Sequence, residues 1–307
     1  MFFPVLPAPV DGEVLFVCAR YRDGKALWGS LLNEIGARRD GDGLVIEGSE
    51  VRIRLVENTG WHFLHGGNVP ALVPAGGPAP SVVVLADGAV AYGDGGPLLV
   101  DLETIPGRGV RVPSARLGEV LTTLPGGELT FDHLVQDMDV NGMYQGDWGR
   151  PAFPAPVWTS HRAFPELPST AASLLVRTSF DDEEGWQSLL AELDAAHKAD
   201  PDEDDVENPP LEALVVDDRA FEDLQPGQVP ALVPPEKHTT LVALADTRTF
   251  TEPGRPLTVV DLYDIPGRPA VLPLRKIGSM ACNLELANMD FRDFVAREGA
   301  RPWWEDS

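Results

Sequence analysis

An internal duplication constrains this chain more than any other feature of its sequence. The hexapeptide VPALVP occupies residues 69–74 and recurs at residues 229–234, and the tetrapeptide IPGR occupies residues 105–108 and recurs at residues 265–268. Both pairs are separated by 160 positions. Further matches in the same order join Phe3 with Phe164, Trp28 with Trp186, Asp101 with Asp261 and Gly118 with Gly278. Two copies of one domain, each about 150 residues long, account for this regularity.

The spacing of these matches predicts one domain at residues 1–146 and a second at residues 164–307, with the first copy diverged from the second. The residues between them, 147–163, hold Pro151, Pro154 and Pro156 among aromatic side chains. Proline-rich linkers are extended and semi-rigid. We therefore expect the two copies to be held in a fixed relation, as a pseudo-dimer within one chain.

The second copy predicts the secondary structure more clearly than the first. Short apolar runs bounded by Asp, Pro and Gly indicate strands at residues 173–178, 211–216, 240–245, 257–262 and 269–272. A short helix or turn is expected at residues 221–233, and helical segments are expected at residues 277–287 and 290–298. Strands that alternate with helices predict an α/β fold with a mixed central sheet flanked by helices. The two strands around IPGR would form an antiparallel edge of that sheet.

A helix is predicted directly after the first of these strands. Asp181 and Glu184 have the spacing of a capping box, in which Asp181 is the N-cap. Trp186 then begins an apolar face that continues at i+3, i+4 and i+7, and the first copy repeats the face from Trp28 onward. The duplicated Trp186 is a candidate binding residue, although its spacing is more typical of a core side chain.

Four aspartates at or near predicted strand ends form the main candidate site: Asp217, Asp218, Asp246 and Asp261. Ligands of α/β sheets bind at the carboxyl ends of parallel strands, and carboxylate oxygens are ligands for Mg²⁺. If a metal is bound, Asp217, Asp218 and Asp246 would hold it. The first copy has Asn58 at the position that matches Asp218, so such a site would belong to the second copy. The alternative role of these aspartates is to cap helices and turns.

Other polar residues are weaker candidates. Arg268, which is duplicated as Arg108, would bind a carboxylate or phosphate or pair with a nearby aspartate. Asn283, Asn288 and Asp290 stand together in an otherwise apolar segment, where the alternative role is again capping.

No catalytic residue is assigned, because the sequence contains no motif for a nucleophile, a phosphate-binding loop or a zinc site. Its two cysteines, Cys18 and Cys282, are expected to be reduced and partly buried. The amino-terminal segment has no basic region before its apolar residues, and no apolar run approaches the roughly 18 residues of a membrane span. We therefore expect a cytoplasmic protein without a membrane partner.

The charge of the chain is strongly negative and unevenly distributed. There are 24 basic and 48 acidic side chains, for a formal net charge of −24. This balance excludes nucleic acid as a partner, because phosphate binding requires a basic face. Residues 181–207 alone hold 12 acidic side chains and one lysine.

The motifs LLVRTSFDDEEGW, VVDDRAF, PALVP, VVDL with IPGR, and NLELANMDFRDF make the second copy resemble an uncharacterised domain-of-unknown-function family from high-GC Gram-positive bacteria. The likeness extends over residues 171–298 and, more weakly, over residues 12–146. It implies the domain limits and a bacterial cytoplasmic setting, and it implies no chemistry or cofactor.

Two functions remain open from the sequence. The first is a non-catalytic binding or regulatory protein, in one version an acidic, immunity-type inhibitor of a basic protein, since complementary charge accelerates association and selects partners. The alternative is an enzyme that depends on a metal held by the strand-end aspartates of the second copy.

Overall fold

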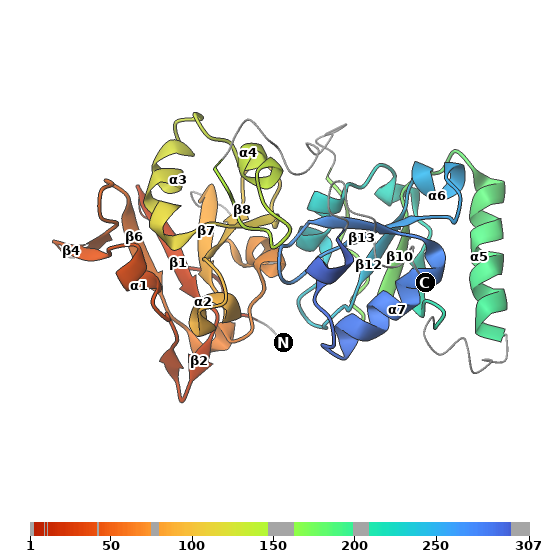
Figure 1. The fold of residues 1–307 in the computed structure, drawn as a ribbon, viewed down its shortest axis with the longest axis horizontal. Helices are drawn as coiled ribbons and strands as arrows, with labels where there is room; N and C mark the ends of the chain where they lie inside the picture. The colour runs from red at the N-terminus through yellow and green to blue at the C-terminus, as the bar shows by residue number, and fades with distance from the viewer. Residues whose placement is uncertain are drawn as a thin grey trace. The chain divides into compact units, whose positions relative to one another are not determined.

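The structure is a computed structural model that describes residues 3–8, 10, 12–41, 43–74, 80–146, 163–198 and 209–295. The chain divides into two compact units, residues 1–157 with 262–267 and residues 158–261 with 268–307 (Figure 1). The expected linker lies outside the described residues except for Ala163, as does the acidic stretch at residues 200–207.

The first unit is built on a seven-stranded mixed sheet in the order β4-β5-β6-β1-β7-β8-β9. Strands β6, β1 and β7 are parallel in the centre, and the strands on either side of them run antiparallel to their neighbours. The bounds are β1 Glu13–Cys18, β4 Arg38–Asp40, β5 Gly43–Val45, β6 Arg52–Val56, β7 Val82–Ala86, β8 Leu98–Asp101 and β9 Gly109–Arg111, with a separate hairpin of β2 Tyr21–Arg22 and β3 Lys25–Ala26.

The second unit repeats the central part of this sheet with five strands in the order β11-β10-β12-β13-β14. Strands β11, β10 and β12 are parallel, while β13 and β14 form the antiparallel pair expected around IPGR. The bounds are β10 Ser173–Arg177, β11 Ala213–Val216, β12 Val242–Ala245, β13 Leu257–Val260 and β14 Pro269–Leu272. Two homologous α/β domains, each with a mixed central sheet flanked by helices, are therefore confirmed.

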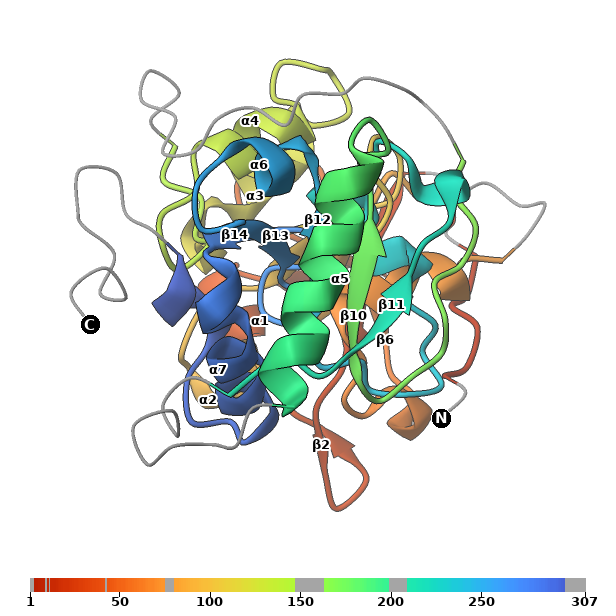
Figure 2. The ribbon, with the colours of Figure 1, turned by 90° about the vertical axis from the view of Figure 1, so that its right-hand side faces the viewer.

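The sheet centres form the cores of the two units. Every residue of β7, β10 and β12 is buried, as continuous apolar strands covered on both faces require. In the second unit, α5 (Glu183–Lys198) lies over the sheet (Figure 2) and buries Trp186 and Leu189 on its inner face. Trp186 is therefore a core side chain, as its spacing indicates.

The remaining helices are short, apart from α7. They are α1 Leu31–Glu34, α2 Gly88–Tyr92, α3 Leu117–Thr123, α4 Phe131–Gln136, α6 Thr247–Thr251 and α7 Leu274–Glu285, together with 3-10 turns at Thr59–Trp61, Gly66–Leu72, Ser114–Arg116, Arg219–Phe221, Pro226–Gln228, Pro230–Leu232 and Phe291–Phe294. In the part of the chain that the structure describes, no helix is long and apolar enough to cross a membrane.

Two expectations for the helix after the first strand are wrong. Its N-terminus is capped by Asp182, whose Oδ1 accepts a hydrogen bond from the backbone N–H of Gly185 at 2.7 Å, and not by Asp181. In the first unit the matching helix, α1, has four residues and ends before Gly36, which has a left-handed φ of +60°. The chain then turns into the β4–β5 hairpin, which the second unit does not show among its described residues.

Candidate functional site

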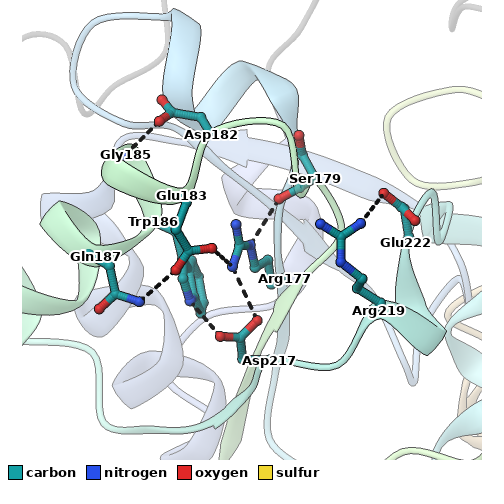
Figure 3. A network of polar contacts seen from close by, with 10 residues as sticks. All are labelled: Arg177, Ser179, Asp182, Glu183, Gly185, Trp186, Gln187, Asp217, Arg219 and Glu222. Carbon is teal, nitrogen blue, oxygen red and sulfur yellow. Dashed lines mark hydrogen bonds and ion pairs between the residues drawn. The ribbon is translucent and has the colours of Figure 1, made fainter.

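The strand-end cluster of the second unit consists of Arg177, Glu183, Trp186 and Asp217, which come together where β10 and β11 end (Figure 3). Arg177 is the last residue of β10, and Asp217 directly follows β11. Glu183 and Trp186 project from the first turns of α5. The cluster therefore lies at the carboxyl ends of two parallel strands, where α/β proteins place their ligands.

Arg177 is the buried centre of the cluster, with 2% of its surface exposed. Its Nη1 donates to Glu183 at 2.8 Å and to Asp217 at 3.3 Å, and its Nε donates to the carbonyl oxygen of Ser179 at 3.1 Å. Nη2 has no hydrogen-bond partner among the described residues. The guanidinium lies 4.4 Å from the ring centre of Phe180 and 5.3 Å from that of Trp186, so the two aromatic faces stabilise the buried charge.

The two carboxylates of the cluster are more open to solvent than the arginine. Glu183 has 67% of its side chain exposed and Asp217 has 42%. Hydrogen bonds from Gln187 and then from Arg177 lower the pKa of Glu183, because both stabilise the ionised carboxylate. Asp217 accepts one further hydrogen bond, from the indole Nε1 of Trp186 at 2.9 Å. The cluster thus binds α5 to the ends of two strands.

The first unit keeps half of this arrangement. Trp28 donates from Nε1 to the carboxylate of Glu57 at 2.7 Å, as Trp186 does to Asp217. The register of the parallel strands places Cys18 opposite Ala86 and Arg177 opposite Ala245, so Cys18 stands where the second unit has its arginine. Burial raises the pKa of the Cys18 thiol. Cys18 is buried as expected, but Cys282 is exposed.

The other strand-end aspartates contact different groups. Asp218 accepts a hydrogen bond from the backbone of Ala220 at 2.8 Å. Asp246 accepts from the backbone of Arg248 at 2.8 Å and from the hydroxyl of Thr258 at 2.7 Å. Across the described ranges, no three His, Cys, Asp or Glu side chains are grouped as a metal site would need. The aspartates therefore cap turns and join strands, and only Asp217 enters the strand-end cluster.

Asp261 precedes the duplicated IPGR turn, and Arg268 is the last residue of that turn. The backbone N–H of Asp261 donates to the carbonyl of Arg268 at 2.9 Å, and both side chains are buried. The first unit shows the function of this pair, since Arg108 donates to Asp101 at 3.0 Å while the Asp101 carboxylate accepts from the backbone of Ile105 at 3.0 Å. The interpretation that this arginine pairs with an aspartate is confirmed in the first unit.

Asn283, Asn288 and Asp290 do not converge on one point. Asn283 donates from its amide to the carbonyl of Ser279 one helical turn earlier, at 2.8 Å. Asn288 donates its backbone N–H to the carbonyl of Asn283 at 3.0 Å after α7 ends. Asp290 begins the last 3-10 turn, where it pairs with Arg292 and forms a reciprocal cap with Asp293.

The first unit also contains a cavity of about 550 Å³ between α1, the turn after β5, and α3. Buried Ile35 and Ile46 form its floor, and the exposed side chains of Glu34 and Glu47 stand at its rim. Hydroxyl groups of Ser114 and Ser30 lower the pKa of Glu34 by hydrogen bonding to the carboxylate. The rim is therefore negative, and the cavity favours cationic over anionic groups.

Sequence reasoning did not identify Arg177 or Glu183. The signal for Arg177 was a charged residue that closes an otherwise apolar strand, in the segment LLVR. A buried arginine at such a place requires carboxylate or aromatic neighbours, and the following segment FDDEEGW, residues 180–186, is rich in both.

Comparison with known families agrees with the duplication and with the two sheets. A family model described as Domain of unknown function (DUF6924) matches residues 13–147 and again residues 172–303. No match was found among curated proteins. Each matched stretch contains one complete mixed sheet with its helices. The chain therefore belongs to this family and carries two tandem copies of its domain.

Proposed function

We propose that the protein is a non-catalytic binding protein of the bacterial cytoplasm, and that its second unit binds a basic protein through the acidic start of α5. The observation that carries this proposal is a group of carboxylates at residues 181–184, of which Asp181, Glu183 and Glu184 are exposed. Asp181 and Glu184 are exposed and form no ion pair within the described part of the chain. Complementary charge of this kind selects partners and accelerates their association.

The cations near α5 leave this negative surface open. Arg177 is buried, and Lys198 pairs with Asp194 at 2.5 Å within the last turns of the helix. Arg255 pairs with Glu192 at 3.1 Å. Basic groups therefore neutralise the middle and the end of α5 and, through Arg177, Glu183 at its start, whereas Asp181 and Glu184 remain for a partner. An immunity-type inhibitor of a basic enzyme is one form that such a protein would take.

The test begins with capture. The full chain is immobilised and incubated with a lysate of its host at low and at high salt, and a protein retained at low salt is purified. Its affinity is then measured for the natural chain, for the double variant D181N/E184Q, and for a matched double variant of exposed acids in the first unit, E103Q/E128Q.

We expect the affinity to fall with salt and to fall about tenfold in D181N/E184Q, with little change in the control. An equal loss in both variants would show that net charge alone drives binding. Failure of any purified protein to bind, or binding that salt does not weaken, would overturn the proposal.

A further inference from the structure

The free edge of β11 is an unusual surface in the second unit. β11 is the last strand on its side of the sheet, and β10 is its one neighbour among the strands that the structure describes (Figure 2). Leu214 is 46% exposed and Val215 is 40% exposed. An exposed apolar edge strand presents unpaired N–H and C=O groups on which another strand can form.

The first unit contains the same strand with the start of its outer edge covered. The registers with β1 and β10 align β6 with β11, so that Val56 matches Val216 and Arg54 matches Leu214. β6 pairs on its outer side with β5, which runs antiparallel to it along Arg52 and Ile53, the residues that match Glu212 and Ala213. The duplication therefore shows what this edge accommodates, which is a short antiparallel strand. It also shows an arginine where the second unit exposes a leucine.

Charge identifies the kind of strand that the β11 edge would accept. Glu212 precedes β11, and Asp217 and Asp218 follow it, and all three are exposed. If two copies of this chain paired antiparallel through β11, Glu212 of each would face Asp217 and Asp218 of the other, and like charges at such positions are destabilising. A strand flanked by Lys or Arg would meet opposite charges at both ends.

We propose that β11 is a docking strand on which an extended, basic segment of a partner protein pairs antiparallel, as β5 pairs with β6. The backbone ladder would supply affinity, and the exposed side chains of Leu214 and Val215 together with the flanking carboxylates would supply specificity. This inference rests on the proposed function, since it names how the basic partner is held.

The probe is a short synthetic peptide that alternates Val with Thr and carries Lys at both ends. Two control peptides differ from it by one feature each: one has a central Pro, which removes a backbone donor, and one has Glu in place of Lys. Binding to the full chain is measured at physiological salt, together with hydrogen exchange of the backbone amides at residues 212–216.

We expect the Lys peptide to bind and to slow exchange in β11, and the Pro and Glu peptides to bind at least about tenfold more weakly. L214R should weaken binding by a similar factor and should fold, because Arg54 occupies the same place in the first unit. L214T removes the apolar contact while keeping strand propensity, and should act in the same direction. L286R is the matched control, since Leu286 is 63% exposed and lies after α7.

Equal weakening by L214R and L286R, or binding of the Pro peptide as tight as that of its parent, would overturn the strand-pairing inference and leave the charge-based function standing. Sedimentation should find the free chain monomeric. A dimer that protects β11 would show that a second copy occupies the edge and would likewise overturn the inference. Loss of salt-sensitive capture with β11 protection retained would instead count against the acidic start of α5.

Discussion

Trp28 and Trp186 make the same contact in the two copies, since each indole nitrogen donates to a carboxylate that follows the neighbouring strand. Each tryptophan thereby fixes the segment after the first strand to the sheet. The copies differ in the residue beside this contact, which is Cys18 in one and Arg177 in the other. The arginine adds a buried charge, and the second copy surrounds it with two carboxylates and two aromatic rings.

Asp217 receives hydrogen bonds from two buried donors, so replacing it should lower the free energy of unfolding. D217A leaves the indole N–H of Trp186 without its acceptor and removes one of two carboxylates from Arg177, so we expect a loss of about 2 kcal/mol in the free energy of unfolding. D218A removes the same charge from the adjacent residue and loses one capping hydrogen bond, so it should lower the free energy of unfolding by about 0.5–1 kcal/mol. Urea unfolding followed by tryptophan fluorescence measures both. Equal losses of unfolding free energy in D217A and D218A would mean that the strand-end cluster stabilises the fold no more than a single capped turn does.

The two cysteines should differ in reactivity. Burial raises the pKa of the Cys18 thiol and shields it, whereas Cys282 is exposed. We expect iodoacetamide at mildly alkaline pH to modify Cys282 first, and Cys18 at a rate limited by opening of the fold. Mass spectrometry of the labelled peptides follows both sites, and C282S removes the fast phase. Fast labelling of Cys18 in the folded chain would contradict its position in the core.

The sequence could place the strand-end aspartates but not their contacts. Asp217, Asp218 and Asp246 lie just after their strands, as the apolar runs indicate. Which of them meets Arg177 depends on the path of α5 over the sheet, and that path is set by packing between residues far apart in the chain. The hypothesis of a shared metal site assumed that side chains at neighbouring strand ends converge. In the structure each of these three aspartates contacts a different group.

At the scale of elements, strands were predictable because each is a short, largely apolar run, and three of the five in the second unit are wholly buried. The expected strand at residues 269–272 coincides with β14, and the others differ from the structure at their ends. The helix after β10 was predicted well and its counterpart in the first copy was not. The apolar face from Trp28 to Ile35 reads as helical, yet Gly29 and Gly36 both adopt positive φ and confine α1 to four residues.

Gly118 and Gly278 match in the two copies, and their surroundings predict different effects of adding a side chain. A Cβ at Gly278 in α7 would lie 1.9 Å from the carbonyl oxygen of Pro209, whereas one at Gly118 in α3 would lie 2.9 Å from a methyl group of Ile46. Backbone cannot move away as a side chain can, so G278A should destabilise the fold by more than about 2 kcal/mol. In G118A, the helix-propensity gain of about 1 kcal/mol should offset most of the cost. Thermal unfolding of both variants tests this, and an equal effect would contradict the difference in packing.

At the scale of the whole molecule, the net charge of −24 predicts how stability responds to salt. Self-repulsion of like charges destabilises the compact state, and salt screens it. We expect the melting temperature to rise as NaCl is increased from low to physiological concentration, because exposed ion pairs contribute little that screening would remove. A steady fall would show that attractive pairs dominate.

Magnesium provides the control for this prediction. MgCl₂ at matched ionic strength should produce the same rise in melting temperature as NaCl, since the described aspartates are not grouped as ligands. A larger rise with Mg²⁺ that D217N abolishes would favour the metal-dependent alternative.

The β5 strand that covers β6 has a consequence for the number of partners that one chain can join. A tandem duplication ordinarily yields two equivalent docking edges, and a bivalent chain can crosslink its partners into open networks. Here the β4–β5 hairpin covers the start of the edge in the first copy, and no described strand covers it in the second. A partner that docks on β11 as proposed would therefore find one such edge per chain, and its complex would have a fixed stoichiometry.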